Sequence, residues 1–118
     1  MSIIVEKSEH FAIRIVRLYQ YLREEKKEYV LSKQILRSGT SIGANLAEAT
    51  YAISKNDFIA KRYIALKEVS ETLYRLKLLF NTDYLSREQY ESIVQDAEEL
   101  RKLLASSTKT LQSKEPAT

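Results

Sequence analysis

The sequence predicts an all-α protein, an up-down-up-down antiparallel four-helix bundle that assembles into a homo-oligomer. The chain of 118 residues has only two glycines and one proline, so little interrupts a helix. Apolar residues recur at alternating spacings of three and four, the pattern of a helix that buries one face. The segments between these patterns are short, which makes consecutive helices antiparallel neighbours.

The first two helices follow directly from this spacing. We expect the first from about Ser8 to Lys27 and the second from about Ser32 to Ile53. The apolar seam of the first consists of Phe11, Ile15, Leu18 and Leu22, and that of the second of Ile35, Gly39, Ile42, Leu46, Ala49 and Ile53.

Two capping patterns mark the starts of the third and fourth helices. Ser54 with Asp57 resembles a capping box, and Ser86 with Gln89 forms one. The third seam is Ile59, Arg62, Leu66, Val69, Leu73, Leu76 and Phe80, and the fourth is Tyr90, Ile93, Ala97, Leu100 and Leu104. Beyond Ser106 the composition turns to Ser, Thr, Lys and Gln, so we expect one bundle domain over residues 1–108 and a flexible C-terminal tail over residues 109–118.

Both glycines lie in the second predicted helix, within the pentapeptide from Gly39 to Gly43. Read as G-x-S-x-G, this is the nucleophile elbow of α/β-hydrolases, which needs a strand-to-helix turn and a later histidine. Here the sole histidine, His10, precedes Ser41, and helix is predicted on both sides. We therefore interpret Gly39, Gly43 and Ala47 as small residues, four apart, that let another helix approach closely.

A polar stripe runs along the same helix. Arg37, Ser41, Asn45 and Glu48 fall within an arc of about 80° at 100° per residue. Arg37 and Glu48 are roughly 16 Å apart along the axis, too far to pair directly. The stripe is either a solvated face, or a network bridged through Ser41 and Asn45, or a set of residues with partners on another helix.

Some apolar residues point away from the predicted seams. They are Ile13 and Val16 in the first helix and Ile64 and Leu78 in the third. A helix that is apolar nearly all round is a buried helix, so we interpret these four as an oligomer interface. The alternative is scattered surface apolar residues, which every protein has.

Composition excludes several function classes. There is no cysteine, so disulfides and thiolate metal sites are absent, and His10 lacks the Glu-x-x-His spacing of di-metal bundles. Two glycines so placed allow no Walker or dinucleotide loop. No apolar run reaches membrane-spanning length and no signal peptide is recognisable, so we expect a cytoplasmic, non-enzymatic protein without cofactors.

Basic residues are the remaining chemistry, although the net charge of +3 is mild. The candidates for nucleic-acid binding lie on the two helices with apolar surface off the seam: Arg14, Arg17, Lys61, Arg62 and Lys67. Lysine and tyrosine also alternate on one flank of the third helix (Tyr63, Lys67, Tyr74, Lys77). Those tyrosines either stack on bases or pack at a subunit contact.

Three segments carry a resemblance to a known family: Phe11–Tyr19, Gln34–Ala49 and Ile64–Glu68. They resemble the 23S rRNA intervening-sequence proteins, a family of four-helix bundles, and the resemblance covers about Phe11 to Leu104. The family's signature is matched at Arg37, Ser41, Ile42, Asn45, Ala47 and Glu48.

The resemblance implies a bacterial protein, encoded within an insertion of a 23S rRNA gene or free-standing. A related group, the accessory proteins of diversity-generating retroelements, forms a basic barrel-like pentamer that works with a reverse transcriptase. By this resemblance we expect a pentamer that contacts RNA. We do not expect the protein to be an enzyme. The competing interpretation is a protein-interaction scaffold without direct nucleic-acid contact. Arg62 departs from the family, in which this position is more often apolar.

Overall fold

The computed structural model describes the backbone of residues 2–113 and the side chains of residues 2–108. This part of the chain contains four helices and no strand. The helices are α1 (Ile3–Glu24), α2 (Leu31–Ala49), α3 (Lys55–Asn81) and α4 (Arg87–Ser113). The prediction of an all-helical chain with four helices is confirmed.

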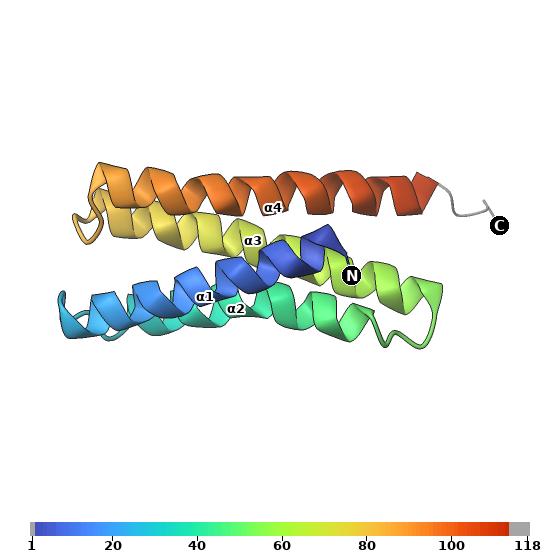
Figure 1. Cartoon of the computed structure of the whole chain (residues 1–118), viewed down its shortest axis with the longest axis horizontal. Coiled ribbons are helices and arrows are strands. Elements are labelled where there is room, and N and C mark those ends of the chain that lie inside the picture. Colours follow the sequence, from blue (N-terminus) through green and yellow to red (C-terminus); the bar gives the residue numbers. More distant parts are fainter. Residues whose placement is uncertain (1, 114–118) are drawn as a thin grey trace.

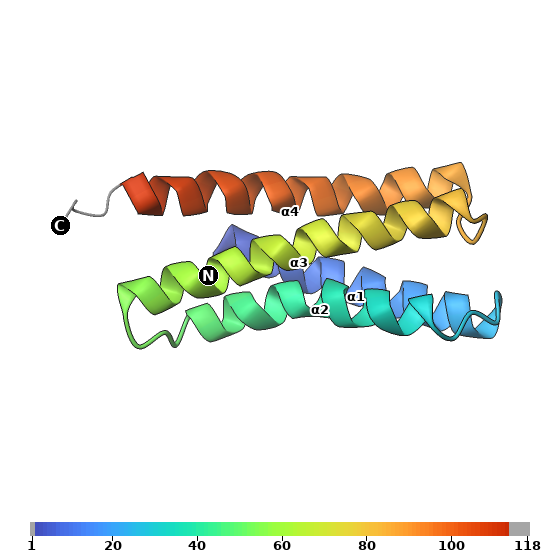
Figure 2. The ribbon, with the colours of Figure 1, turned by 180° about the vertical axis from the view of Figure 1, so that it is seen from behind.

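The four helices lie side by side, and the ribbon turns back at each connection (Figure 1). α2 contacts α1 and α3, and α4 contacts α3 and α1; the α2–α3 contact is the most extensive and the α1–α4 contact the least. α1 and α3 are therefore diagonal: α1 lies in front in Figure 1, and α3 in front in the reverse view of Figure 2. The largest fully buried apolar side chains are Phe11, Ile15, Leu22, Ile35, Ile42, Leu46, Leu76, Leu79, Leu100 and Leu104.

Both predicted capping patterns are confirmed. The Asp57 amide donates to Ser54 Oγ at 3.0 Å at the start of α3. At the start of α4 the Gln89 amide donates to Ser86 Oγ at 3.1 Å, and the Ser86 amide donates to Gln89 Oε1 at 2.9 Å. Each serine thus satisfies an amide that has no partner within its helix.

α1 begins five residues earlier than predicted. Ser8 is a residue type that favours the N-cap, but here it is buried within the helix and its hydroxyl donates to the carbonyl oxygen of Val5 at 2.7 Å. Ile4 is also buried, so the apolar seam extends about two turns beyond Phe11 towards the N-terminus.

α2 ends earlier than predicted, at Ala49. The chain closes the helix with tight turns, in which the amides of Thr50 and Tyr51 donate to carbonyl oxygens three residues back. The expected seam position Ile53 falls in this connection and is 94% exposed. Its assignment to the seam was wrong, because the chain must leave the helix to reach the Ser54 cap.

The buried face of α3 is also rotated from the predicted seam. The fully buried positions are Ile59, Ala65, Val69, Thr72, Leu76 and Leu79, whereas Leu66, Leu73 and Phe80 are partly buried. α3 contacts helices on two sides, so its buried arc is wider than one seam. The ring of Phe80 stacks on Tyr90 of α4, with centroids 4.5 Å apart.

α4 continues as helix to Ser113, past residue 108, where we placed the end of the bundle domain. Residues 114–118 of the predicted tail lie outside the described part of the chain. Within the described residues, no helix is long and apolar enough to cross a membrane.

Candidate functional site

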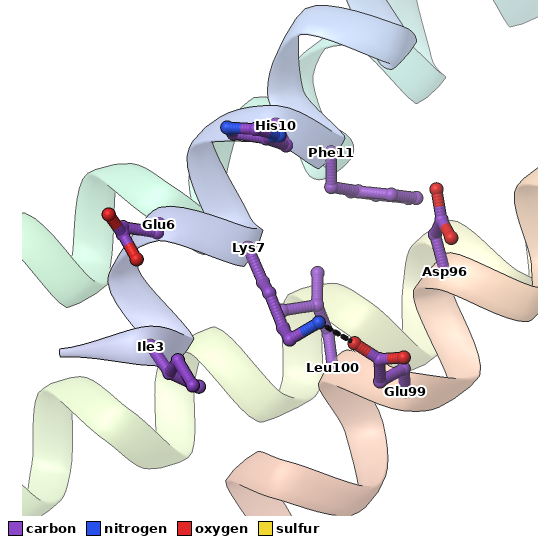
Figure 3. Close-up of a pocket in the computed structure, with 8 residues that line it drawn as sticks. All are labelled: Ile3, Glu6, Lys7, His10, Phe11, Asp96, Glu99 and Leu100. Atoms are coloured by element: carbon purple, nitrogen blue, oxygen red, sulfur yellow. Dashed lines mark ion pairs between the residues drawn. The ribbon is translucent and has the colours of Figure 1, made fainter.

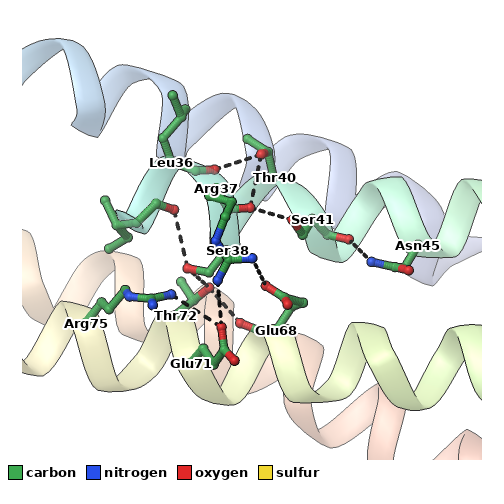
Figure 4. A network of polar contacts seen from close by, with 11 residues as sticks. Leu36, Arg37, Ser38, Thr40, Ser41, Asn45, Glu68, Glu71, Thr72 and Arg75 are labelled. Atoms are coloured by element: carbon green, nitrogen blue, oxygen red, sulfur yellow. Dashed lines mark hydrogen bonds and ion pairs between the residues drawn. The ribbon is translucent and has the colours of Figure 1, made fainter. Parts of the chain in front are cut away.

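A cluster of ion pairs joins α2 to α3 (Figure 4). Arg37 Nη2 lies 2.9 Å from Glu71 Oε2, and its Nη1 lies 3.5 Å from Glu68 Oε2. Arg75 pairs with the same Glu71 oxygen at 3.4 Å. The hydrogen bond to Glu71 and the charge of Glu68 raise the pKa of Arg37 above its usual value. Arg37 therefore ties two consecutive turns of α3 to α2.

The other residues of the predicted polar stripe divide between two roles. Ser41 Oγ donates to the carbonyl oxygen of Arg37 at 2.6 Å, and Asn45 Nδ2 donates to that of Ser41 at 2.8 Å (Figure 4). Glu48 lies 3.7 Å from Lys61 Nζ on α3. The structure thus gives Arg37 and Glu48 partners on another helix, while Ser41 and Asn45 bond within α2 and do not bridge the two charges.

A pair of buried hydroxyls lies beneath these ion pairs. Thr72 Oγ1 is 3.0 Å from Ser38 Oγ and donates to the carbonyl oxygen of Glu68 at 2.7 Å (Figure 4). Both side chains are fully buried. Our sequence reasoning missed this contact because it placed Leu73 rather than Thr72 on the seam. A signal was present, since Thr72 lies three residues after Val69 and four before Leu76.

The two glycines bring α2 close to α1. A Cβ at Gly39 would lie 2.6 Å from Ile15 Cγ1, and a Cβ at Gly43 would lie 3.3 Å from Ser8 Oγ. Both positions therefore lie against α1, although only Gly39 excludes a methyl group outright. Ala47 does not share this role: it is exposed, because the α1-facing side of α2 passes through Leu46 at this level.

The α1–α4 contact contains two neighbouring pockets. The first, of about 430 Å³, lies beside Phe11 and Leu100 and is crossed by an ion pair between Lys7 and Glu99 (Figure 3). The second, of about 490 Å³, lies between Arg17 and Gln89 over an apolar floor that includes Ile93. The hydrogen bond to Glu99 raises the pKa of Lys7.

Two ion pairs lie along these pockets, Lys7 with Glu99 and Arg14 with Asp96. Arg14 Nη1 lies 2.7 Å from Asp96 Oδ2, and its Nη2 donates to Ser92 Oγ at 2.9 Å. His10 and Glu6 point away from the carboxylates of α4 (Figure 3). No group of histidine and acidic residues in the described part of the chain is arranged to hold a metal ion. These pairs fasten α1 to α4.

The five basic candidates do not share one surface. Arg14 and Arg17 are on α1 and the other three are on the diagonal helix α3. Arg14 is held by α4, and Lys61 pairs with Glu48. Of these five, Arg17 and Lys67 alone are exposed and have no ion pair with another described residue. Because α1 and α3 are diagonal, the five candidates do not form one patch on a single subunit.

Arg62 occupies the seam between α3 and α4 as predicted. Its Nη2 donates to Ser107 Oγ at 2.6 Å, and its guanidinium lies 5.4 Å from the Phe58 ring centroid. Its Nε is buried without a hydrogen-bond partner, as is Oγ1 of Thr108. Burial lowers the pKa of Arg62. It is a partly desolvated cation with no carboxylate beside it among the described residues.

The four apolar interface candidates lie on opposite sides of the bundle. Ile13 is 52% exposed and Val16 is 37% exposed, both on the outer face of α1. Ile64 is 38% exposed on α3, whereas Leu78 is partly buried and contributes less. The two helices are diagonal, so these exposed side chains form two separate patches and no continuous one.

Comparisons with known proteins agree with this architecture. Residues 2–106 match the family described as 23S rRNA-intervening sequence protein. A solved structure with a TM-score of 0.90 is that of a protein with unknown function from the S23 ribosomal protein family of Bacteroides thetaiotaomicron VPI-5482. It is 59% identical over 91% of this chain and 99% of its own. The comparison with curated proteins gave no match. The chain belongs to the 23S rRNA-intervening sequence protein family.

Proposed function

We propose that this protein is a non-enzymatic, homo-oligomeric, up-down-up-down antiparallel bundle that binds RNA. The observation that carries the RNA part is the distribution of unpaired cations. Five described cations without an ion pair lie within one stretch at the end of α1 and the start of α2: Arg17, Arg23, Lys26, Lys27 and Lys33. The others without an ion pair, such as Lys67 and Lys102, are spread over α3 and α4. Most other cations already neutralise an acid, for example Arg14 and Arg37.

This stretch carries a net positive charge that suits an anionic ligand such as phosphate. Residues 17–33 hold five basic and three acidic residues, and one acid, Glu28, is occupied by the amides of Val30 and Ser32. Repetition of this surface around an oligomer multiplies a modest charge into a strong local potential. Nothing in the described part of the chain resembles a base-reading module, so phosphate neutralisation is the main source of affinity.

Two apolar patches on opposite sides support the oligomer. When the α1 patch of one subunit meets the α3 patch of the next, the contact is heterologous, and it generates a ring where the rotation between neighbouring subunits closes. A pentamer, as in the related accessory proteins, is one such ring. Light scattering at micromolar concentration should give a mass near five times the 13.7 kDa of the chain. A species of 13.7 kDa alone contradicts the assembly.

RNA binding is tested by gel shift on structured RNA at ~50 mM salt. We expect binding that weakens steeply as salt rises, because each neutralised phosphate releases counterions. The double variant Arg17→Gln with Lys26→Gln should flatten that dependence, whereas Lys102→Gln, an exposed lysine on α4, changes it little. If no RNA complex forms at low salt, the alternative function, a cytoplasmic protein-interaction scaffold, is favoured.

A further inference from the structure

A third pocket lies where α1 ends and the connection to α2 begins. It has a volume of about 390 Å³ and is lined by Tyr19, Gln20, Arg23, Glu24, Lys27 and Tyr29. We propose that this pocket binds one unpaired nucleotide of a single-stranded RNA segment, with the base stacked on Tyr29 and the phosphate beside Arg23 and Lys27. The inference rests on the proposed RNA binding and assigns it a site.

Arg23 is held in place by two aromatic rings. Its guanidinium carbon lies 5.6 Å from the ring centroid of Tyr19 and 5.5 Å from that of Tyr29. Its Nη1 also donates to the Tyr19 hydroxyl at 2.7 Å. These contacts orient a cation that forms no ion pair within the described residues, so its donors remain available to an anion.

Tyr29 projects from a fixed backbone. On its N-terminal side the Glu28 amide donates to the Leu22 carbonyl oxygen at 2.9 Å, which closes the end of α1. On its C-terminal side the Glu28 carboxylate accepts from the amides of Val30, at 3.1 Å, and Ser32, at 2.7 Å. The side chain of Tyr29 is nevertheless 49% exposed. An exposed ring on a rigid backbone offers a stacking surface at little entropic cost.

Lys27 adds an independent argument. It adopts φ = 55°, in the left-handed region where glycine is favoured at the end of a helix. A non-glycine residue in this conformation is uncommon, and such strain clusters at functional sites. Here the strained residue is a lysine with its side chain in the wall of the pocket. Its charge is thus placed beside Arg23 at a cost to the fold.

The chemistry favours an unpaired nucleotide over a duplex. Aromatic faces accept any base whose own face is free, and cations at the rim accept the adjoining phosphate. In a duplex both faces of an internal base are already stacked, so only phosphate contacts remain. The Glu24 carboxylate can accept from an N–H group at the edge of the bound base, which in uracil is N3–H.

The experiment is fluorescence anisotropy of the full-length protein with labelled oligouridylate of about 12 nucleotides and with an RNA duplex of equal length. Tyr29→Ala should weaken binding of the single strand roughly 5- to 150-fold, the range for loss of one stacked base. It should leave duplex binding unchanged. Tyr29→Phe keeps the stacking surface and should bind within about threefold of wild type.

The controls separate stacking from charge. Tyr51→Ala removes an exposed tyrosine from the α2–α3 connection, at the other end of the bundle (Figure 1), and should bind as wild type does. Arg23→Gln should lower the slope of log affinity against log salt by about 0.7, whereas Tyr29→Ala should not change it. Circular dichroism of each variant verifies that the helices are retained.

Each outcome of the binding experiment either supports or rejects the pocket as the binding site. If wild type binds oligouridylate and Tyr29→Ala binds it equally well, the pocket is not the site, although RNA binding stands. If wild type binds neither probe at ~50 mM salt, the proposed function and this site fail together. Weaker single-strand binding by Tyr29→Ala, with Tyr29→Phe and Tyr51→Ala intact, supports the site.

Discussion

Gly39→Ala should destabilise the protein even though alanine is the better helix former. The new methyl carbon would lie 2.6, 2.8 and 3.0 Å from three side-chain carbons of Ile15. Ile15 is fully buried and β-branched, so its side chain has few other rotamers in a helix. Overpacking of this kind costs about 1–3 kcal/mol, whereas the gain in helix propensity is at most about 1 kcal/mol. We expect a net loss of about 1–2 kcal/mol of unfolding free energy.

Gly43→Ala is the matched control. Its methyl carbon would approach only Ser8 Oγ closely, at 3.3 Å, so a shift of a few tenths of an ångström suffices. The two variants gain the same propensity, and the difference between them isolates the contact with Ile15. We expect Gly43→Ala to lie within about 0.5 kcal/mol of wild type.

Urea unfolding followed by far-UV circular dichroism measures both variants at one fixed protomer concentration. A second test places Gly39→Ala in an Ile15→Ala background, where the three clashing carbons are gone. There the substitution should stabilise, by up to about 1 kcal/mol. The close-contact argument is refuted if the Gly39→Ala variant unfolds at or above the urea midpoint of wild type. It is also refuted if the substitution lowers the free energy of unfolding equally in both backgrounds.

Four further outcomes follow from the structure. Arg37→Met should lower the free energy of unfolding by about 1 kcal/mol, because it leaves the mostly buried carboxylate of Glu68 (13% exposed) without its cation. The difference in unfolding free energy between the variant and wild type should be smaller in 1 M NaCl. Arg62→Met should stabilise by up to about 1 kcal/mol in urea unfolding, since it removes an unpaired, partly desolvated charge; Lys67→Met is the exposed control, and a large loss for Arg62→Met contradicts the argument. Lys27→Gly should raise the unfolding free energy by about 0.5–1 kcal/mol while weakening RNA binding, and unchanged binding speaks against a role for its charge. Ile13→Glu should shift light-scattering mass towards the single subunit without loss of helical circular dichroism, and an unchanged mass shows that this patch lies outside the interface.

The sequence predicted the helices better than the contacts between them. Period and capping residues are local, so the four helices and the Ser54 and Ser86 caps could be placed from the chain alone. The buried register of α3 could not be predicted, because Ala65 and Thr72 take the core positions that hydrophobicity assigns to Leu66 and Leu73, and this depends on where α2 and α4 lie. A seam assigned from hydrophobicity alone omits Thr72, although its hydroxyl is hydrogen-bonded within its own helix and can therefore be buried.

The polar and basic residues show the same limit in another form. Arg37 and Glu48 stood out on α2, but their partners Glu68, Glu71 and Lys61 belong to another helix and depend on tertiary packing. The five basic candidates were chosen from two helices that turned out to be diagonal. The pocket around Tyr29 arises from the end of α1, a left-handed lysine and a capped α2 together, and no single spacing encodes it.

The unequal helix contacts also set the order in which the bundle opens. α2 and α3 share the most extensive contact and are tied by Arg37, whereas α1 and α4 share the least, with pockets along their length. Separation of α1 from α4 therefore breaks the fewest interactions and is the lowest-energy partial unfolding. Amide hydrogens of α1 should exchange with solvent sooner than those of α2 and α3. The molecule thus consists of a central helical hairpin, α2–α3, and two outer helices, α1 and α4, that detach from each other first.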